Sequence, residues 1–133
     1  MMTQGAALVT LLVLLTSMSA PAGETIVIEA TRLVPPVLET MTGNRVDFVN
    51  RAQRSVHVEF GVDPRQHEVV QVPATGPIWA VFHRPGTHPY VVHVYDGRTT
   101  RTLSGVVAVV EDETHKWDSR TCGLVIMEIC IEP

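Results

Sequence analysis

Apolar and polar side chains alternate in short runs along most of this chain, and turn-forming residues separate the runs. In Ser55–Phe60, for example, Val56, Val58 and Phe60 alternate with polar residues, which is the period of a strand with one buried face. The runs are Thr25–Ala30, Val37–Met41, Arg45–Asn50, Ser55–Phe60, Glu68–Val72, Ile78–Phe82, Tyr90–Tyr95 and Leu103–Val110. Because no segment shows a convincing helical period, the pattern predicts an all-β fold.

Glycine, proline, asparagine and aspartate occupy the gaps between these runs. Examples are Thr42-Gly43-Asn44, Pro85-Gly86 and Asp96-Gly97, where the chain must reverse direction. Short valine-rich strands at this spacing are typical of an antiparallel sandwich or barrel. A domain of this size buries about two-thirds of its unfolded surface, so its stability does not require a metal.

The first 22 residues differ from the rest because they carry no charged side chain. Ala6–Leu15 is almost wholly apolar, yet it is too short to span a bilayer as a helix. It is followed by Ala20-Pro21-Ala22, which fits the small-x-small rule of signal peptidase. We expect residues 1–22 to be a signal peptide, which predicts a periplasmic or secreted protein with no membrane span after cleavage. The alternatives are an uncleaved anchor or a mis-assigned start.

The mature chain divides into a β-sandwich over residues 23–113 and a C-terminal extension over residues 114–133. The extension contains both cysteines, Cys122 and Cys130. Export favours a disulfide between them, although the strand-like residues between them require the chain to turn back, for example near Gly123. The alternative is a Cu(I) site formed by the two cysteines and Met127, all of which are soft sulfur ligands.

The charge and the motifs exclude several classes of function. The chain has 14 acidic and 10 basic residues, a net charge of -4, and its arginines are scattered along the sequence. Nucleic-acid binding is not expected, because it requires a basic stripe to neutralise phosphates. Motifs of serine hydrolases, zinc proteases and phosphate-binding loops are absent, so we do not expect an enzyme.

The order of short motifs resembles that of the cupredoxins. The strand motif Gly43-Asn-Arg-Val-Asp-Phe-Val-Asn50 is similar to one in that family, and His57 lies where its first histidine ligand would be. Phe82, Pro85-Gly-Thr-His88, Tyr90 and Leu103-Ser-Gly-Val106 then follow in the family's order. The resemblance covers residues 26–110 and implies a cupredoxin-like, antiparallel Greek-key β-sandwich.

The resemblance does not extend to the blue-copper ligands. Val92 occupies the cysteine position, Tyr95 the second histidine position and Leu103 the axial methionine position, so only His57 remains. A blue-copper centre requires a thiolate with two imidazoles. We therefore do not expect a blue-copper electron carrier.

Histidines nevertheless gather around the segment that holds copper in that family. His83, His88 and His93 recur every five residues, and the family geometry would place them with His57 near one end of the sandwich. Imidazoles suit Cu(II), zinc or nickel, and Glu59 and Asp96 could add carboxylate oxygens. The competing interpretation is that each histidine is an ordinary surface or half-buried residue.

The sequence therefore predicts an exported cupredoxin-like protein that binds a copper ion through histidines and serves in copper handling. The predicted ligands are His57 and His93 first, then His83 and His88. Two alternatives remain open. One is a metal-free interaction module that binds a protein, such as a periplasmic partner, or a small ligand, and the other is an accessory subunit of a periplasmic redox complex.

Overall fold

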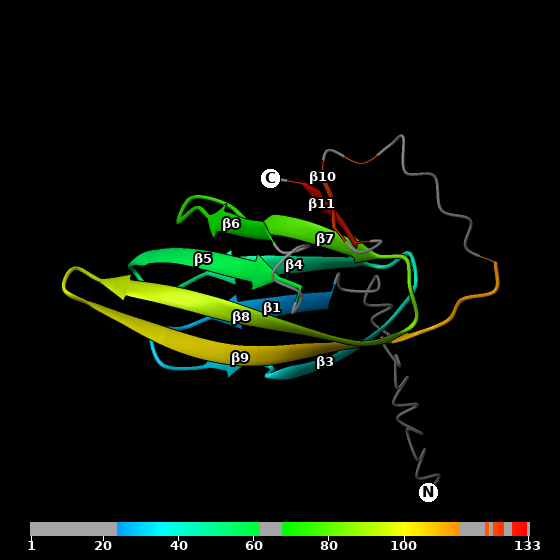
Figure 1. The fold of residues 1–133 in the computed structure, drawn as a ribbon, viewed down its shortest axis with the longest axis horizontal. Coiled ribbons are helices and arrows are strands. Elements are labelled where there is room, and N and C mark those ends of the chain that lie inside the picture. Colours follow the sequence, from blue (N-terminus) through cyan, green and yellow to red (C-terminus); the bar gives the residue numbers. More distant parts are fainter. Residues whose placement is uncertain (1–23, 62–67, 115–121, 123, 127–128, 133) are drawn as a thin grey trace, which may run out of the picture.

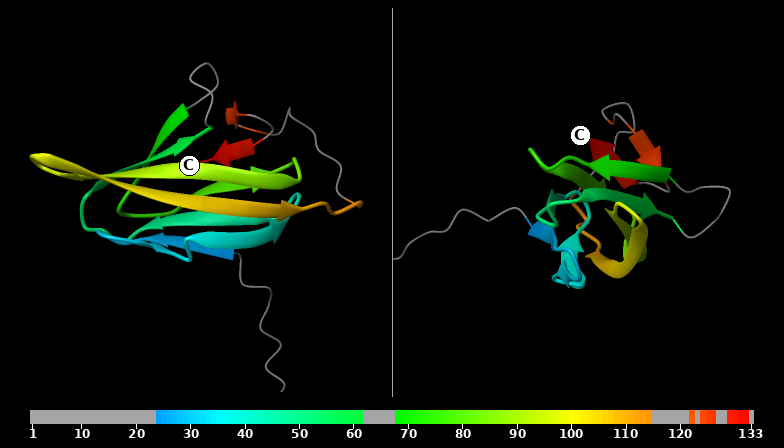
Figure 2. Two further views of the ribbon diagram at one scale, coloured as in Figure 1. Left: turned by 60° about the horizontal axis from the view of Figure 1, so that its bottom comes forward. Right: turned by 90° about the vertical axis from the view of Figure 1, so that its left-hand side faces the viewer.

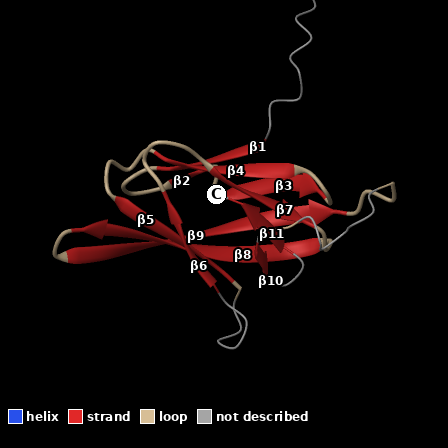
Figure 3. Cartoon of the chain, turned by 90° about the horizontal axis from the view of Figure 1, so that it is seen from above, coloured by secondary structure: helices blue, strands red, loops and turns tan. Residues whose placement is uncertain are grey.

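The computed structural model describes residues 24–61, 68–114, 122, 124–126 and 129–132, and every regular element in these ranges is a β-strand (Figure 1; Figure 3). The expected signal peptide and Met127 lie outside the described residues. The described ranges contain no helix of the length and apolarity that a membrane crossing requires. The prediction of an all-β sandwich is confirmed.

The strands form two sheets, of six and five strands. The six-stranded sheet has the order β10 (Leu124–Ile126), β11 (Ile129–Glu132), β7 (Ile78–Phe82), β4 (Arg45–Asn50), β1 (Glu24–Ile28) and β2 (Leu33–Val34). The five-stranded sheet has the order β3 (Val37–Met41), β9 (Thr99–Val110), β8 (Gly86–Asp96), β5 (Ser55–Phe60) and β6 (Glu68–Val72). Neighbouring strands are antiparallel except in two pairs, β1 with β4 and β3 with β9, which are parallel.

Strands β8 and β9 form one long hairpin where the sequence resembled a metal-binding loop. Their pairing is continuous from Gly86 opposite Val109 to Asp96 opposite Thr99, and Gly97 in the turn has a φ of 59°. The hairpin projects beyond the other strands at one end of the molecule (Figure 2). Both strands are longer than their apolar runs. β9 adds the polar residues 99–102 beside the turn, while β8 adds Asp96 beside the turn and residues 86–89 at the opposite end of the hairpin.

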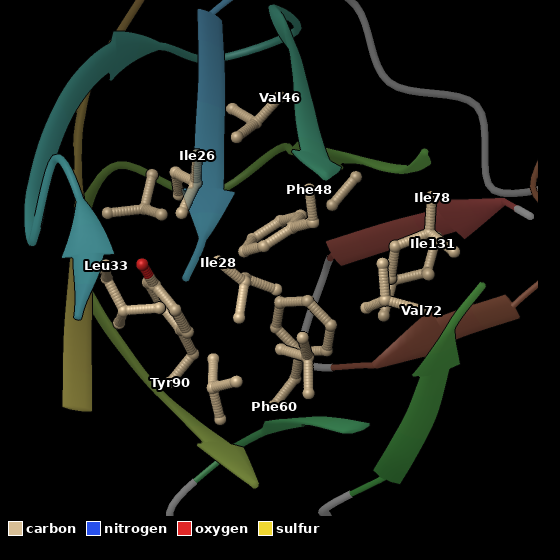
Figure 4. Close-up of a cluster of buried hydrophobic side chains, with 14 of the residues drawn as sticks. Ile26, Ile28, Leu33, Val46, Phe48, Phe60, Val72, Ile78, Tyr90 and Ile131 are labelled. Carbon is tan, nitrogen blue, oxygen red and sulfur yellow. The ribbon is translucent and has the colours of Figure 1, made fainter. Parts of the chain in front are cut away.

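A single apolar core fills the space between the sheets (Figure 4). The ring of Phe48 lies edge-to-face against Phe60 and Tyr90, with centroid distances of 5.5 Å and 5.4 Å. Such aromatic pairs contribute about 0.5–1.5 kcal/mol each beyond the area that they bury. The two sheets therefore share one well-packed core, which fixes the positions of the residues on their outer faces.

Tyr90 reaches across the hairpin into the space that Gly105 leaves open. The two residues are cross-strand partners, and a Cβ on Gly105 would lie 2.3 Å from the Tyr90 hydroxyl. That hydroxyl is buried without a hydrogen-bond partner among the described residues, and burial raises the pKa of Tyr90. The Gly105 position therefore accepts no larger side chain without displacing this ring.

The C-terminal strands complete the six-stranded sheet. β11 pairs with β7, with Cys130 opposite Val81, and β10 pairs with β11 (Figure 2). The predicted bridge between Cys122 and Cys130 is confirmed, with a Cα–Cα distance of 5.4 Å. β10 and β11 are antiparallel, with Leu124 opposite Ile131 and Val125 opposite Cys130, which brings Cys130 back toward Cys122.

Candidate metal centre

His57 and His93 face each other on the outer surface of the five-stranded sheet. In β5, Val56 and Val58 are buried and His57 points to the other face; in β8, Val92 and Val94 are buried in the same way around His93. The antiparallel register of β5 and β8 places His57 directly opposite His93. Because directly opposed residues have Cβ atoms about 4.5–5.5 Å apart, the two imidazoles can approach one ion.

Glu59 joins this pair from the next outward position on β5. Its Oε2 lies 2.8 Å from Nε2 of His93, and both side chains are partly exposed. An ionised carboxylate can only accept a hydrogen bond, so Nε2 of His93 carries the hydrogen and the Nε2–H group donates a hydrogen bond to Oε2 of Glu59. A neutral His93 then has its lone pair on Nδ1, in the arrangement by which a carboxylate commonly orients a metal-binding histidine.

His57 has an unsatisfied nitrogen beside this contact. Its Nδ1 is buried, with no hydrogen-bond partner among the residues that the structure describes. The ring of Tyr95 packs edge-on against His57 at a centroid distance of 5.0 Å, which limits the rotation of the imidazole. A buried polar atom without a partner costs about 1–3 kcal/mol, so a bound ion or proton donor would be stabilising here.

The positions of the blue-copper ligands do not fit a copper–thiolate centre. Val92 is fully buried in the core, Leu103 packs against that core, and Tyr95 is exposed on the outer face beside His57. None of these side chains supplies sulfur or imidazole, and a blue-copper site requires both. The hairpin therefore retains the fold without that set of ligands.

The four predicted histidines do not meet at one end of the sandwich. His88 and His93 are five residues apart on the same strand, which separates them by about 16 Å at the usual rise and places them on opposite faces. His88 packs against the ring of Phe82 and donates from Nε2 to the carbonyl of Arg84 at 2.7 Å. The expectation of a single four-histidine cluster is wrong, because alternation along a strand turns an odd spacing to the other face.

His83 lies at a third place, beside the disulfide. It directly follows β7, and one of its ring nitrogens lies within 4.8 Å of the sulfurs of Cys122 and Cys130. Asp96, another candidate ligand, forms an exposed ion pair with Arg54 at 2.7 Å near the tip of the hairpin. The structure therefore joins His57, His93 and Glu59, and it separates them from the remaining candidates.

Two contacts at these places were not predicted from the sequence. The sequence placed Tyr95 only at the position of the family's second histidine, yet its ring packs against His57. It did not predict the contact of His83 with the cysteines. The odd spacing of the histidines in the runs was the one available signal for their separation. The contact of His83 with the disulfide depends on the pairing of β11 with β7, which no local pattern reveals.

Solved structures with a similar fold are cupredoxins. An oxidized methionine-to-leucine mutant of amicyanin matches with a TM-score of 0.53 and 20% identity, over 70% of this chain and 87% of that chain. A reduced tryptophan-to-tyrosine mutant of amicyanin gives 0.52 and 19%, over 69% and 87%. Native pseudoazurin from Hyphomicrobium denitrificans gives 0.46 and 13%, over 66% and 75%. No model of a known protein family and no curated protein matches the chain. The predicted cupredoxin-like fold is thus confirmed.

Proposed function

We propose that this chain is an exported copper-handling protein that binds one Cu(II) ion through His57 and His93. The observation that carries the proposal is the direct opposition of the two histidines on one sheet face, with Glu59 in contact with His93. Imidazole nitrogens without a sulfur ligand suit Cu(II) better than Cu(I). His83 and His88 lie elsewhere and are not ligands of this ion in our proposal.

The proposed role is storage, delivery or protection, and it involves neither catalysis nor fast electron transfer. A site of nitrogen and oxygen ligands on a sheet face lacks the sulfur ligands that hold copper in both oxidation states. Export is supported by the Cys122–Cys130 disulfide, since such bonds persist in oxidising compartments. In this proposal the chain binds a metal ion, and its partner is a periplasmic protein that accepts the ion.

Copper titration of the oxidised protein, followed by EPR and visible absorption, tests the proposal. We expect one saturable equivalent of Cu(II) with nitrogen hyperfine structure and without an intense blue band. His57→Ala and His93→Ala should each weaken binding, and the double variant should abolish the signal. His88→Ala is the matched control, because His88 is also a half-buried histidine of β8 and lies away from the pair.

Two outcomes would contradict the proposal. One is the absence of saturable binding, which would favour a metal-free interaction module of the same fold. The other is binding that survives in the His57→Ala/His93→Ala variant, which would place the ion at different residues.

A further inference from the structure

A second set of metal-binding side chains lies on the outer face of the six-stranded sheet. One ring nitrogen of His83 and the sulfurs of Cys122 and Cys130 all lie within 4.8 Å of one another. Within the described ranges, no other group of three or more histidine, cysteine, aspartate or glutamate residues brings its ligand atoms this close. These residues share none of the ligands of the Cu(II) site.

Strand pairing explains why the three residues meet. Cys130 of β11 lies opposite Val81 of β7, and His83 is two residues beyond Val81, so it shares the outward face and is a diagonal neighbour of Cys130. The disulfide holds Cys122 against Cys130. The imidazole and the two sulfurs are thus positioned by the sheet and by a covalent bond.

We propose that reduction of the Cys122–Cys130 disulfide opens a Cu(I) site formed by these two sulfurs and the imidazole of His83. While the disulfide is intact, neither sulfur is a thiolate, so the three residues cannot bind Cu(I) together. A dithiol reductant supplies two electrons and two protons, becomes a disulfide itself, and leaves two thiols on this chain. Binding of Cu(I) then releases the two thiol protons, because the thiolate is the metal ligand.

The ligand atoms lie within 4.8 Å of one another, close to the separation that a single ion requires. Metal–sulfur bonds of about 2.3 Å and metal–nitrogen bonds of about 2.0 Å place the ligands of one ion no more than ~4.6 Å apart. After reduction the two sulfurs must move from their bonded distance to about 4 Å apart so that one ion can bind both. Cys130 is 4% exposed, while Cys122 and His83 are half-buried, so the site is sheltered and still has an exposed side.

The ligand types favour Cu(I) over Zn(II). Thiolate sulfur is a soft ligand that selects Cu(I), zinc or iron–sulfur clusters. Protein zinc sites are almost always four-coordinate, and the described part of the chain brings only three ligands together here. Three ligands of this kind are sufficient for Cu(I), which we therefore assign to the site.

The test is a competition for Cu(I) between the protein and a chromophoric Cu(I) chelator under anaerobic conditions. The protein is reduced with a phosphine, which takes up oxygen from water as the disulfide becomes two thiols, and the phosphine is then removed. The experiment uses the His57→Ala/His93→Ala background, so that the Cu(II) site does not contribute. His83→Ala is the test variant, and His88→Ala is its matched control.

We expect the reduced protein to withdraw one equivalent of Cu(I) and the oxidised protein to withdraw none. His83→Ala should lower the affinity by about tenfold or more, by loss of one of three ligands, while His88→Ala should leave it unchanged. X-ray absorption of the complex should show two sulfur ligands and one nitrogen ligand. Near-UV circular dichroism, recorded for each sample, reports whether the reduced chain keeps its fold.

Several results would overturn the proposal. Equal uptake of Cu(I) by the oxidised and reduced proteins would show that binding does not depend on reduction of the disulfide. An equal effect of His83→Ala and His88→Ala would remove the imidazole from the site. Loss of the near-UV signal on reduction, without recovery when Cu(I) is added, would show that no folded site forms. Uptake of Zn(II) in place of Cu(I) would refute the assigned metal.

Discussion

The two outer faces of the sandwich cover the same core but carry different potential metal ligands. The five-stranded sheet presents His57 opposite His93, with Glu59 hydrogen-bonded to His93. The six-stranded sheet presents His83 beside two sulfurs that are joined in a disulfide. In our two proposals, one fold therefore carries two sets of ligands for the same element, one suited to each oxidation state of copper.

Reduction of the disulfide should produce the largest change, and it should affect the two faces differently. The bridge joins residues eight apart, and closing so short a loop stabilises the folded state by about 2–3 kcal/mol in the chain-entropy account. Urea unfolding of the oxidised and reduced proteins measures this loss. Cu(II) binding at His57 and His93 should remain the same per folded molecule; a parallel loss of Cu(II) affinity would contradict the independence of the two faces.

A substitution in the core should lower the stability of the whole fold, and so affect both faces to the same extent. Gly105→Ala places a methyl group 2.3 Å from atoms of the Tyr90 ring, and such overpacking costs about 1–3 kcal/mol. The matched control is Gly76→Ala, because a Cβ at Gly76 has no neighbour within 4 Å. Thermal or urea unfolding checks the difference, and equal stability of the two variants would refute the tight contact with Tyr90.

Removing one charge from the five-stranded face should have a smaller and purely local effect. Glu59→Gln retains the shape of the side chain but loses the carboxylate that accepts a hydrogen bond from His93. Loss of such an orienting partner typically weakens metal affinity by about 10-fold or more, or at least ~1.4 kcal/mol. Isothermal titration with Cu(II) measures it, and uptake of Cu(I) by the reduced protein should not change.

The smallest expected effect concerns the interior at high pH. Because burial raises the pKa of Tyr90, the unfolded chain loses its tyrosine proton before the folded chain does. Stability from this group is therefore full below the ordinary tyrosine value of about 10 and falls as the pH rises above it. Urea unfolding at about pH 9 and about pH 11 should show a smaller decline for Tyr90→Phe than for the wild type. An identical decline would show that Tyr90 does not titrate in this way.

The strands themselves could largely be predicted from the sequence. The bounds of β3, β4, β5, β6 and β7 coincide with the apolar runs, since alternation directly reports a sheet face. The two-residue β2 has too few positions to show a pattern. The ends of β8 and β9 were missed because residues 86–89 and 99–102 show no apolar alternation, and only their cross-strand pairing places them in the sheet.

The candidate sites could be predicted only in their residue types. His57 and His93 were selected from the sequence, but their opposition depends on the register of β5 and β8, which long-range packing determines. Grouping His88 with them was wrong for a reason present in the sequence, since an odd spacing on one strand reverses the face. The neighbourhood of His83 depends on a pairing between strands far apart in the chain, and no short pattern encodes it.

The pairing of β11 with β7 also has a consequence for the growing chain. β7 ends at Phe82, while its partner begins at Ile129, so all the intervening residues must be synthesised before that edge of the sheet is covered. Until then β7 is an edge strand with unpaired backbone groups, which is a template for association with another chain. Chains truncated before Ile129 should therefore self-associate, because the last strand covers this edge of the sheet.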